Sequence, residues 1–212
     1  MSKNILQTPA YIIAEVLISG NRVYRNGQMI FESPGSSNAV AFLEEVYAHF
    51  NIDYPKFYKM DSLCKLGFLA AELLLGEIKD QLSETETGVV LSNAHASLDV
   101  DLKYARTIHT GASPALFVYT LPNIVIGEIS IRHRLKGENA FFVFKHFDGN
   151  FTSRYVNGLL ENGLIRNCIC GWVDFLKESY RAELYFVSPE RSGENIPFTT
   201  ENIDKLNQKD NG

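Results

Sequence analysis

The feature that most constrains the fold is an uninterrupted apolar run, Ala140–Phe144, in the second half of the chain. The run has no polar alternation, which is typical of a β-strand buried on both faces. A helix is predicted from Pro122 to about Leu135, because proline suits the first helical turn, and Lys136-Gly137 is expected to end it with a left-handed cap. A second helix is predicted to begin at about Asp148. The turn before this second helix is therefore a place where a functional group can sit.

Hydrophobic periodicity divides the rest of the chain into short segments. Asn26-Gly27 favours a tight hairpin turn. The apolar positions between Asp61 and Leu75 surround a predicted helix, which we expect to be covered on more than one side. We predict helices over 38–50, 61–75 and 149–161, a short helix within 97–110, a hairpin over 23–31, and strands over 10–19, 88–93, 165–172 and 182–187.

The alternation of strands with helices indicates an α/β fold with a mainly parallel sheet. We expect a single domain over residues 1–190. The segment 191–212 is polar and rich in Gly and Asn, and we predict that it forms a frayed tail.

Composition excludes several classes of function. The net charge of −5 and the pI of about 5.6 argue against a nucleic-acid surface. No apolar stretch approaches the ~20 residues that a membrane-spanning helix needs. The first residues lack the apolar core and cleavage site of a signal peptide, so we expect a cytoplasmic protein.

The sequence predicts neither a metal site nor a cofactor. It contains no zinc spacing, no G-x-G-x-x-G pattern and no phosphate-binding loop. We interpret Cys64, Cys168 and Cys170 as small core residues, with Cys64 the best candidate among them for a reactive thiol. No Ser lies in a G-x-S-x-G context, so a hydrolase triad is not indicated.

One stretch resembles a known family. Thr120-Leu-Pro-Asn, then Gly127, then Ile129-Ser-Ile-Arg and Leu135-Lys-Gly-x-Asn are similar to the β-ketoacyl-acyl-carrier-protein synthases of the thiolase-like superfamily. The resemblance covers roughly residues 55–187. It implies one thiolase-type half, with a mixed, mainly parallel five-stranded sheet and helices on both faces.

In that family a Cys nucleophile accepts the acyl chain at the N-terminus of the helix after the central strand. Its place here, nine residues after Gly137 and three before Gly149, holds His146. The His partners from the family's second half are also absent from the sequence. We therefore expect no self-contained 3-oxoacyl synthase activity. The chain is predicted to be a non-catalytic synthase-like subunit that assists acyl-chain elongation in a fatty-acid, polyketide or polyene pathway.

An alternative keeps a catalytic role for His146. An imidazole can serve as base or nucleophile in acyl transfer from a carrier protein or coenzyme A, with Asp148 as the group that orients it. In the simpler interpretation, His146 fills the space of a lost Cys and makes a structural hydrogen bond. His95 follows a predicted strand end, where α/β proteins often place ligands. Taken alone, it indicates only a polar loop residue.

The resemblance also implies binding residues and partners. Phe117, Phe144, Phe147 and Gly149 are the candidates for an acyl-chain pocket, although plain core packing is a second use for the aromatic residues. We expect a homodimer, or a heterodimer with a full-length ketosynthase, formed by pairing of the strand over 139–144. An acyl carrier protein is a further possible partner, and the cations available for it are Arg132, His133, Arg134 and Lys136.

Overall fold

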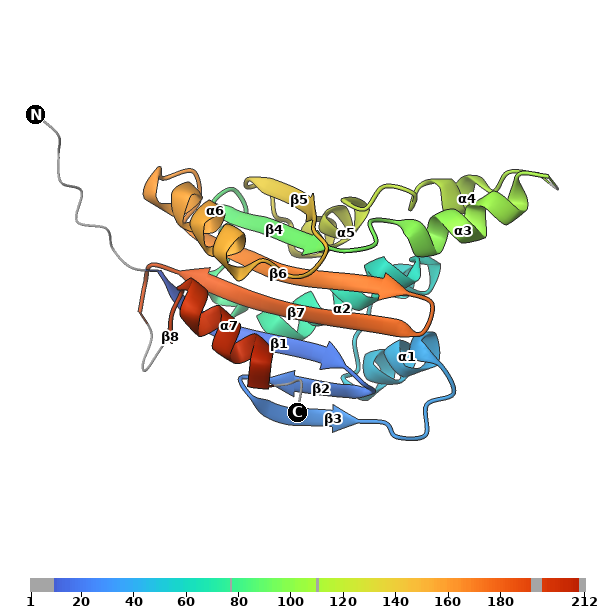
Figure 1. Cartoon of the computed structure of the whole chain (residues 1–212), viewed down its shortest axis with the longest axis horizontal. Helices are drawn as coiled ribbons and strands as arrows, with labels where there is room; N and C mark the ends of the chain where they lie inside the picture. The colour runs from blue at the N-terminus through green and yellow to red at the C-terminus, as the bar shows by residue number, and fades with distance from the viewer. Residues whose placement is uncertain (1–9, 77, 110, 192–195, 210–212) are drawn as a thin grey trace, which may run out of the picture.

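A computed structural model describes residues 10–76, 78–109, 111–191 and 196–209. Within these residues an eight-stranded sheet has the order β3-β2-β1-β7-β6-β4-β5, with β8 paired to β1 (Figure 1). The strands are β1 (Tyr11–Ser19), β2 (Arg22–Arg25), β3 (Gln28–Glu32), β4 (Thr87–Asn93), β5 (Asn139–Val143), β6 (Asn167–Leu176), β7 (Ser179–Ser188) and β8 (Ile196–Pro197). The helices are α1 (Ala39–His49), α2 (Ser62–Leu75), α3 (Leu98–Thr107), α4 (Pro114–Phe117), α5 (Ile124–His133), α6 (Gly149–Glu161) and α7 (Thr200–Lys209), with 3-10 turns at Pro55–Lys59 and Lys79–Gln81.

The α/β class and the mixed sheet with helices on both faces are confirmed, but the sheet has eight strands in place of five and most pairs are antiparallel. Only β4 pairs in parallel, with β5 on one side and β6 on the other, and the remaining pairings are antiparallel. The cause is short connections. Lys177 and Glu178 alone separate β6 from β7, and so short a link permits only an antiparallel hairpin. The Asn26-Gly27 turn, with positive φ at both residues, joins β2 to β3 as predicted.

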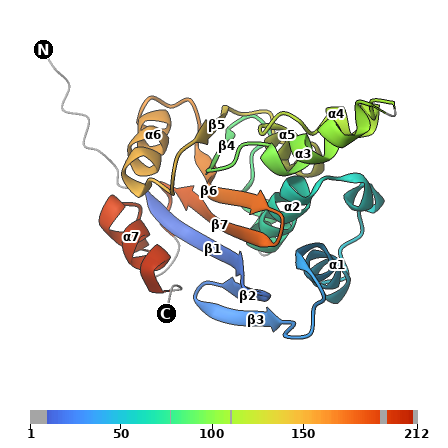
Figure 2. The same cartoon turned by 45° about the vertical axis from the view of Figure 1, so that its right-hand side comes forward.

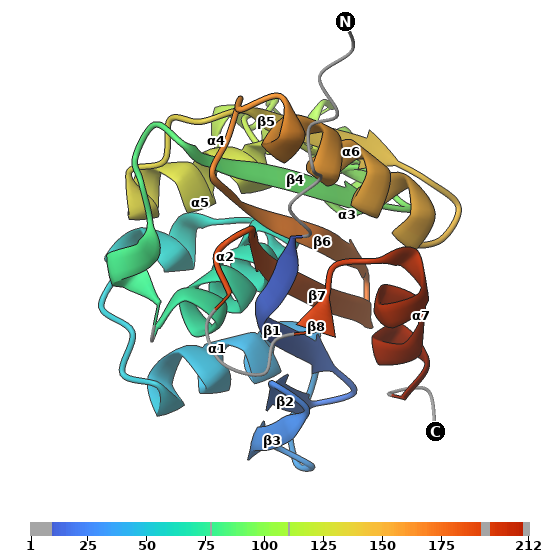
Figure 3. The same ribbon diagram turned by 90° about the vertical axis from the view of Figure 1, so that its left-hand side faces the viewer.

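Helices cover both faces of the sheet. Figure 3 shows α1, α2 and α5 on one face and α6 and α7 on the other. Every residue of α2 is buried, as the apolar sequence of this helix predicted. The Asp61 side chain caps α2 by accepting a hydrogen bond from the Cys64 N–H at 2.9 Å. The larger core lies on the α2 face, and a smaller one lies beneath α6 and α7.

Strand β5 is not buried on both faces, which corrects the prediction made from its apolar run. It is the last strand of the sheet path, paired to β4 alone, and the Val143 residue is 53% exposed. Phe141 packs toward the larger core and Phe142 toward the smaller one. Both faces of this edge strand are therefore partly covered, and this produces an apolar run that resembles that of a central strand.

Two further predictions are corrected. The described part of the expected polar tail forms β8 and α7, and it buries Phe198 and Ile203 against the smaller core. Helix α5 ends earlier than expected, since Arg134 adopts the left-handed cap conformation (φ 58°) that was assigned to Gly137. No helix among the described residues is both long enough and apolar enough to cross a membrane.

The contact between α2 and α5 gives a test of the fold. A Cβ on Gly67 would lie 2.3 Å from Val125 Cγ2, whereas a Cβ on Gly127 would meet nothing within 4 Å. We expect Gly67→Ala to destabilise the protein by about 1–3 kcal/mol through overpacking. The control Gly127→Ala is expected to leave stability unchanged or to raise it by up to about 1 kcal/mol. Urea denaturation followed by circular dichroism measures both, and equal stability of the two variants would contradict the packing described.

Candidate functional site

The candidate site lies where the parallel strands β4 and β5 end. Asn93 pairs with Val143 at this edge, and the Phe144 N–H donates to the Asn93 carbonyl at 2.9 Å. The chain then passes through residues 144–148 and enters α6. Ligands of open α/β sheets commonly bind at the carboxyl ends of the strands. The same edge also holds the loop after β4, which begins at Ala94.

His146 lies in the loop between β5 and α6, and its side chain is exposed. Asp148 does not orient it, because the Asp148 carboxylate caps α6 by accepting from the Phe151 N–H at 2.8 Å. No described side chain forms a hydrogen bond with the His146 imidazole, so the predicted structural hydrogen bond is not found either. The catalytic role of His146 stays a prediction.

The aromatic residues predicted to line one acyl-chain pocket, among them Phe144 and Phe147, do not pack together. Phe142, Phe144, Phe151 and Tyr155 form one group, here called the β5–α6 aromatic cluster, with ring centroids 4.7 Å apart for Phe142 and Phe151 and 5.0 Å for Phe144 and Phe151. All four side chains are partly exposed. Phe147 instead packs against Trp172 and Tyr185, at 6.1 and 6.4 Å between centroids.

Two of the predicted binding residues serve other purposes. Phe117 lies on α4, packs against Tyr104 at 5.5 Å between centroids and is 60% exposed. Helix α4 is at the far end of the molecule from α6 (Figure 1), so Phe117 does not join Phe144 and Phe147. Gly149 is buried beneath α7, where an added Cβ would lie 2.9 Å from the Asp204 carboxylate. That glycine allows α6 and α7 to pack closely.

The loop after β4 contains a pair that the sequence did not connect. His95 Nδ1 lies 2.8 Å from Asp174 Oδ2, and Asp174 Oδ1 accepts the N–H groups of Ala94 and His95, each at 3.1 Å. Asn93 and Ala96 fix the turn with two further hydrogen bonds, of 2.8 and 2.9 Å. The position of His95 at a strand end was the available sequence signal. Its partner is 79 residues away, and only the pairing of β4 with β6 brings the two together.

The predicted basic patch is largely neutralised. Arg132 donates two hydrogen bonds to Glu72, at 2.8 and 3.0 Å, and His133 Nε2 lies 3.1 Å from the same carboxylate. Lys136 pairs with Glu84 at 2.9 Å. Among the described residues, Arg134 is the one of these four cations without a carboxylate partner, and it is exposed. These residues therefore stabilise the fold around α2 and α5 more than they offer a docking charge.

The charge on Glu72 has a consequence for acid stability. Burial acts to raise the pKa of this carboxyl, but the hydrogen bonds and charges of His133 and Arg132 outweigh it and lower the pKa to about 2. Because the folded pKa lies below the unfolded one, ionised Glu72 stabilises the fold fully above about pH 5. That contribution, of order 3 kcal/mol, is lost as the pH falls toward 2.

We expect Glu72→Gln to flatten the fall in unfolding free energy between about pH 5 and 2 in chemical denaturation. Glu84→Gln is the matched control. The pKa of Glu84 is also lowered by its cation, Lys136, but Glu84 is exposed, so its removal is expected to change the curve little. An acid limb that is identical in Glu72→Gln and the unaltered protein would contradict this account.

The described thiols and metal-ligating side chains do not form a reactive centre. Cys64, Cys168 and Cys170 are buried and free, as expected of core residues, and burial raises the pKa of Cys64 well above its usual value. Cys64 is therefore not a reactive thiol. Among the described residues no cluster of His, Cys, Asp and Glu is arranged to hold a metal ion.

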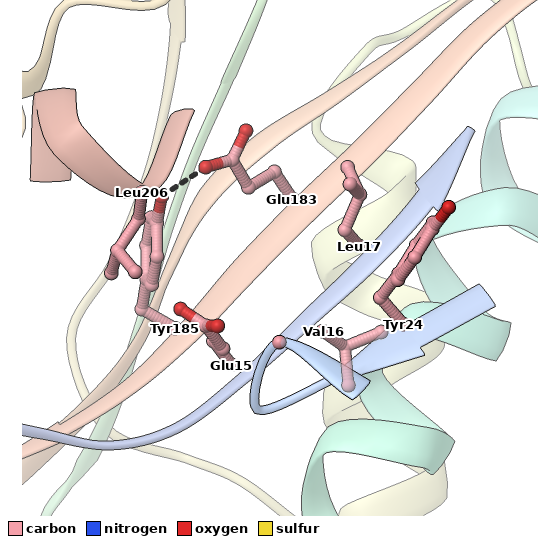
Figure 4. Close-up of a pocket in the computed structure, with 8 residues that line it drawn as sticks. Glu15, Val16, Leu17, Tyr24, Glu183, Tyr185 and Leu206 are labelled. Carbon is pink, nitrogen blue, oxygen red and sulfur yellow. Dashed lines mark hydrogen bonds between the residues drawn. The ribbon is translucent and has the colours of Figure 1, made fainter. Parts of the chain in front are cut away.

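The cavity under α7 is lined by Glu15, Glu183, Tyr185 and Leu206 and has a volume of about 10 Å³ (Figure 4). That volume is enough for about one water molecule and too small for an organic ligand. The Tyr185 hydroxyl donates a hydrogen bond to Glu183, and burial raises the pKa of Tyr185 well above its usual value. Arg181 Nη2 lies 2.6 Å from Glu183 Oε2, and its positive charge balances that of the carboxylate. The group is thus a buried polar network that fixes α7.

Comparison with known proteins places the fold. No family model matches the sequence, and no curated protein matches it. The ishigamide ketosynthase/chain length factor aligns with a TM-score of 0.63 and 17% identity, over 89% of this chain and 64% of that one. The ketosynthase ApeO in complex with its chain length factor ApeC from Xenorhabdus doucetiae aligns at 0.55 and 10%, over 87% and 80%.

The fold is thiolase-like. A β-ketoacyl synthase from Burkholderia phymatum has the same arrangement, with a TM-score of 0.58 and 10% identity over 85% of this chain and 59% of that one. The present chain spans less than two thirds of the length of the first of these solved structures. At such identities the likeness establishes the fold alone. His146 follows β5, which is an edge strand here and not the central strand that the resemblance implied, so its match to the nucleophile position stays a prediction.

Proposed function

We propose that the chain is a non-catalytic, β-ketoacyl-synthase-like subunit that binds a full-length ketosynthase and assists acyl-chain elongation in a fatty-acid, polyketide or polyene pathway. The observation that carries the proposal is the open outer edge of β5. Among the described strands β5 pairs only with β4, so one row of its backbone N–H and C=O groups has no strand partner. An open apolar edge promotes association, and most proteins cover it.

Side chains around β5 favour a protein partner. Val143 is exposed on the strand, and the partly exposed β5–α6 aromatic cluster lies beside it. Aromatic side chains are enriched in the buried centres of protein interfaces. A strand added along β5 would cover these groups and extend the sheet.

A second exposed apolar region supports the same conclusion. Figure 2 shows α3 and α4 projecting from the body of the molecule, beyond the sheet. Contiguous exposed apolar surface commonly marks an interaction site. The large apolar residues that are exposed along α3, α4 and the segments next to them are Leu98, Leu102, Ile108, Phe117, Val118 and Leu121.

The choice of a ketosynthase as the partner, over a second copy of this chain, is supported by the similar structures. Two of them are described as a ketosynthase/chain length factor and as a ketosynthase in complex with its chain length factor. Another similar structure, with a TM-score of 0.59 and 12% identity over 85% of this chain and 62% of that one, is an acyl-carrier protein in complex with its ketosynthase. Since Arg132, His133 and Lys136 are already near carboxylates, we assign carrier-protein docking to the partner.

The assignment as non-catalytic concerns the condensation reaction and rests on the His146 position and the thiols. His146 has no described carboxylate to orient it, and the described thiols are buried. Phe144 and Phe147 remain our candidates for contacts with a growing acyl chain. No contact in the structure favours the alternative, acyl transfer by His146.

Co-expression with a complete ketosynthase from the same genome tests the proposal. We expect a stable complex on size-exclusion chromatography with light scattering. Val143→Lys is expected to weaken it at least tenfold, because the added charge lies at the paired edge. Leu164→Lys is the matched control, since Leu164 is equally exposed, at 53%, but precedes β6 at the opposite edge of the sheet from Val143.

A complex that survives Val143→Lys and is broken by Leu164→Lys would contradict the edge-pairing proposal. A stable homodimer that does not bind the ketosynthase would replace the assigned partner by a second copy of this chain. A monomer under all conditions would contradict both.

A further inference from the structure

We propose that His95 and Asp174 form a general-base dyad that activates water to hydrolyse an acyl thioester. The dyad is built at the edge of the sheet at which β4 and β5 end, beside the strand edge to which we assign the partner. The inference takes its substrate class, an acyl thioester, from the proposed function. It adds a hydrolytic step at residues other than His146, so the chain stays non-catalytic for the condensation reaction alone.

The first observation is that Asp174 is held as an orienting group. Its side chain is 14% exposed, and one oxygen accepts two backbone N–H groups at the turn after β4. The other oxygen faces His95 Nδ1 at 2.8 Å. A carboxylate in this position favours the tautomer that carries its proton on Nδ1, so the lone pair lies on Nε2.

The second observation is that His95 remains accessible. Its side chain is 39% exposed, and no described residue hydrogen-bonds Nε2. The turn is nevertheless rigid, because Asn93 and Ala96 are joined by hydrogen bonds in both directions and Ala96 has positive φ. An oriented imidazole with an open Nε2 is the arrangement that a general base requires.

The other four His residues lack this combination. His133 faces a carboxylate, but its side chain is 5% exposed and Glu72 is shared with Arg132. His49 packs between Phe31 and Phe50. His109 and His146 are exposed and have no described hydrogen-bond partner. Within the part of the chain that the structure describes, only the His95 imidazole is both oriented by a carboxylate and open to solvent.

Two aromatic rings lie on the same face of the sheet as Asp174. Trp172 precedes Asp174 by two residues on β6, so both side chains lie on the face covered by α6. Phe147 contacts Trp172 from the loop after β5. Trp172 is buried, so these rings support the sheet behind Asp174, and the acyl-thioester class is taken from the proposed function.

The reaction balances with water alone. His95 Nε2 takes a proton from water as the water oxygen bonds to the thioester carbonyl carbon. The tetrahedral intermediate collapses, the C–S bond breaks and the sulfur leaves with the electron pair. The imidazolium returns the proton to that sulfur, which gives a free carboxylic acid and a free thiol. Such a step would release stalled or unwanted acyl chains.

Hydrolysis of octanoyl-coenzyme A tests the proposal, with the released thiol measured by a colorimetric reagent. The unaltered protein is assayed alone and with the full-length ketosynthase. We expect turnover above the uncatalysed rate, and a loss of about 100-fold or more in kcat for His95→Ala. Added imidazole is expected to restore part of that loss, which a purely structural role of His95 would not allow.

Asp174→Asn isolates the positioning role of this residue. An amide oxygen still accepts the two N–H groups and keeps the turn, but it no longer favours the productive tautomer. We expect kcat to fall and KM and the thermal midpoint to stay close to those of the unaltered protein. His109→Ala, which removes an exposed imidazole outside the site, is expected to keep full activity.

Two results would overturn the inference. One is the absence of thioester hydrolysis by the unaltered protein, both alone and in the complex. The other is turnover that is lost in His146→Ala and kept in His95→Ala. A complex that forms without hydrolysis removes this inference and leaves the proposed function standing. Hydrolysis that depends on His95 in a chain that binds no ketosynthase removes the proposed function and retains the dyad.

Discussion

The complete burial of α2 is the constraint on which the rest of the structure depends. This helix packs against β1, β6 and β7 of the sheet and against α1 and α5. Its two charged residues, Lys65 and Glu72, are buried, so each needs a partner, and Glu44 and Arg132 supply them from α1 and α5. The ion pairs fix how the flanking helices lie. Helix α5 then leads through the Arg134 cap to β5, and the position of α2 thereby determines where the open strand edge lies.

Much of the fold could be predicted from local patterns. Asp61 as a cap, the Asn26-Gly27 turn and the buried helix over 61–75 each depend on a few adjacent residues, and the structure has all three. The sequence-based prediction was wrong for β5, because its burial depends on which strands pair with it. Nothing in an apolar run distinguishes a strand with neighbours on both sides from an edge strand covered on both faces. The α7 segment appeared disordered because Ile203 and Leu206 are its only buried or partly buried large apolar residues among many polar ones.

The candidate site could be predicted only in part. The resemblance put His146 between the central strand and the next helix, but the strand before it, β5, is at the edge of the sheet. The candidates for the acyl-chain pocket were chosen because they are aromatic, without knowledge of where they lie. Phe117 is remote from Phe144, because α4 and α6 lie at different ends of the sheet. The His95–Asp174 pair carries no local signal. It exists because β4 and β6 are adjacent, which is a property of strand order and not of either segment.

The central claim is that β5 is an interface edge, and amide hydrogen exchange tests it most directly. Exchange in peptides that cover residues 139–143 is compared with and without the full-length ketosynthase at saturating concentration. The account predicts slow exchange of β5 amides in the complex and faster exchange in the isolated chain, with β4 and β6 slow in both. Unchanged exchange in β5, together with new protection only elsewhere on the surface, would contradict it.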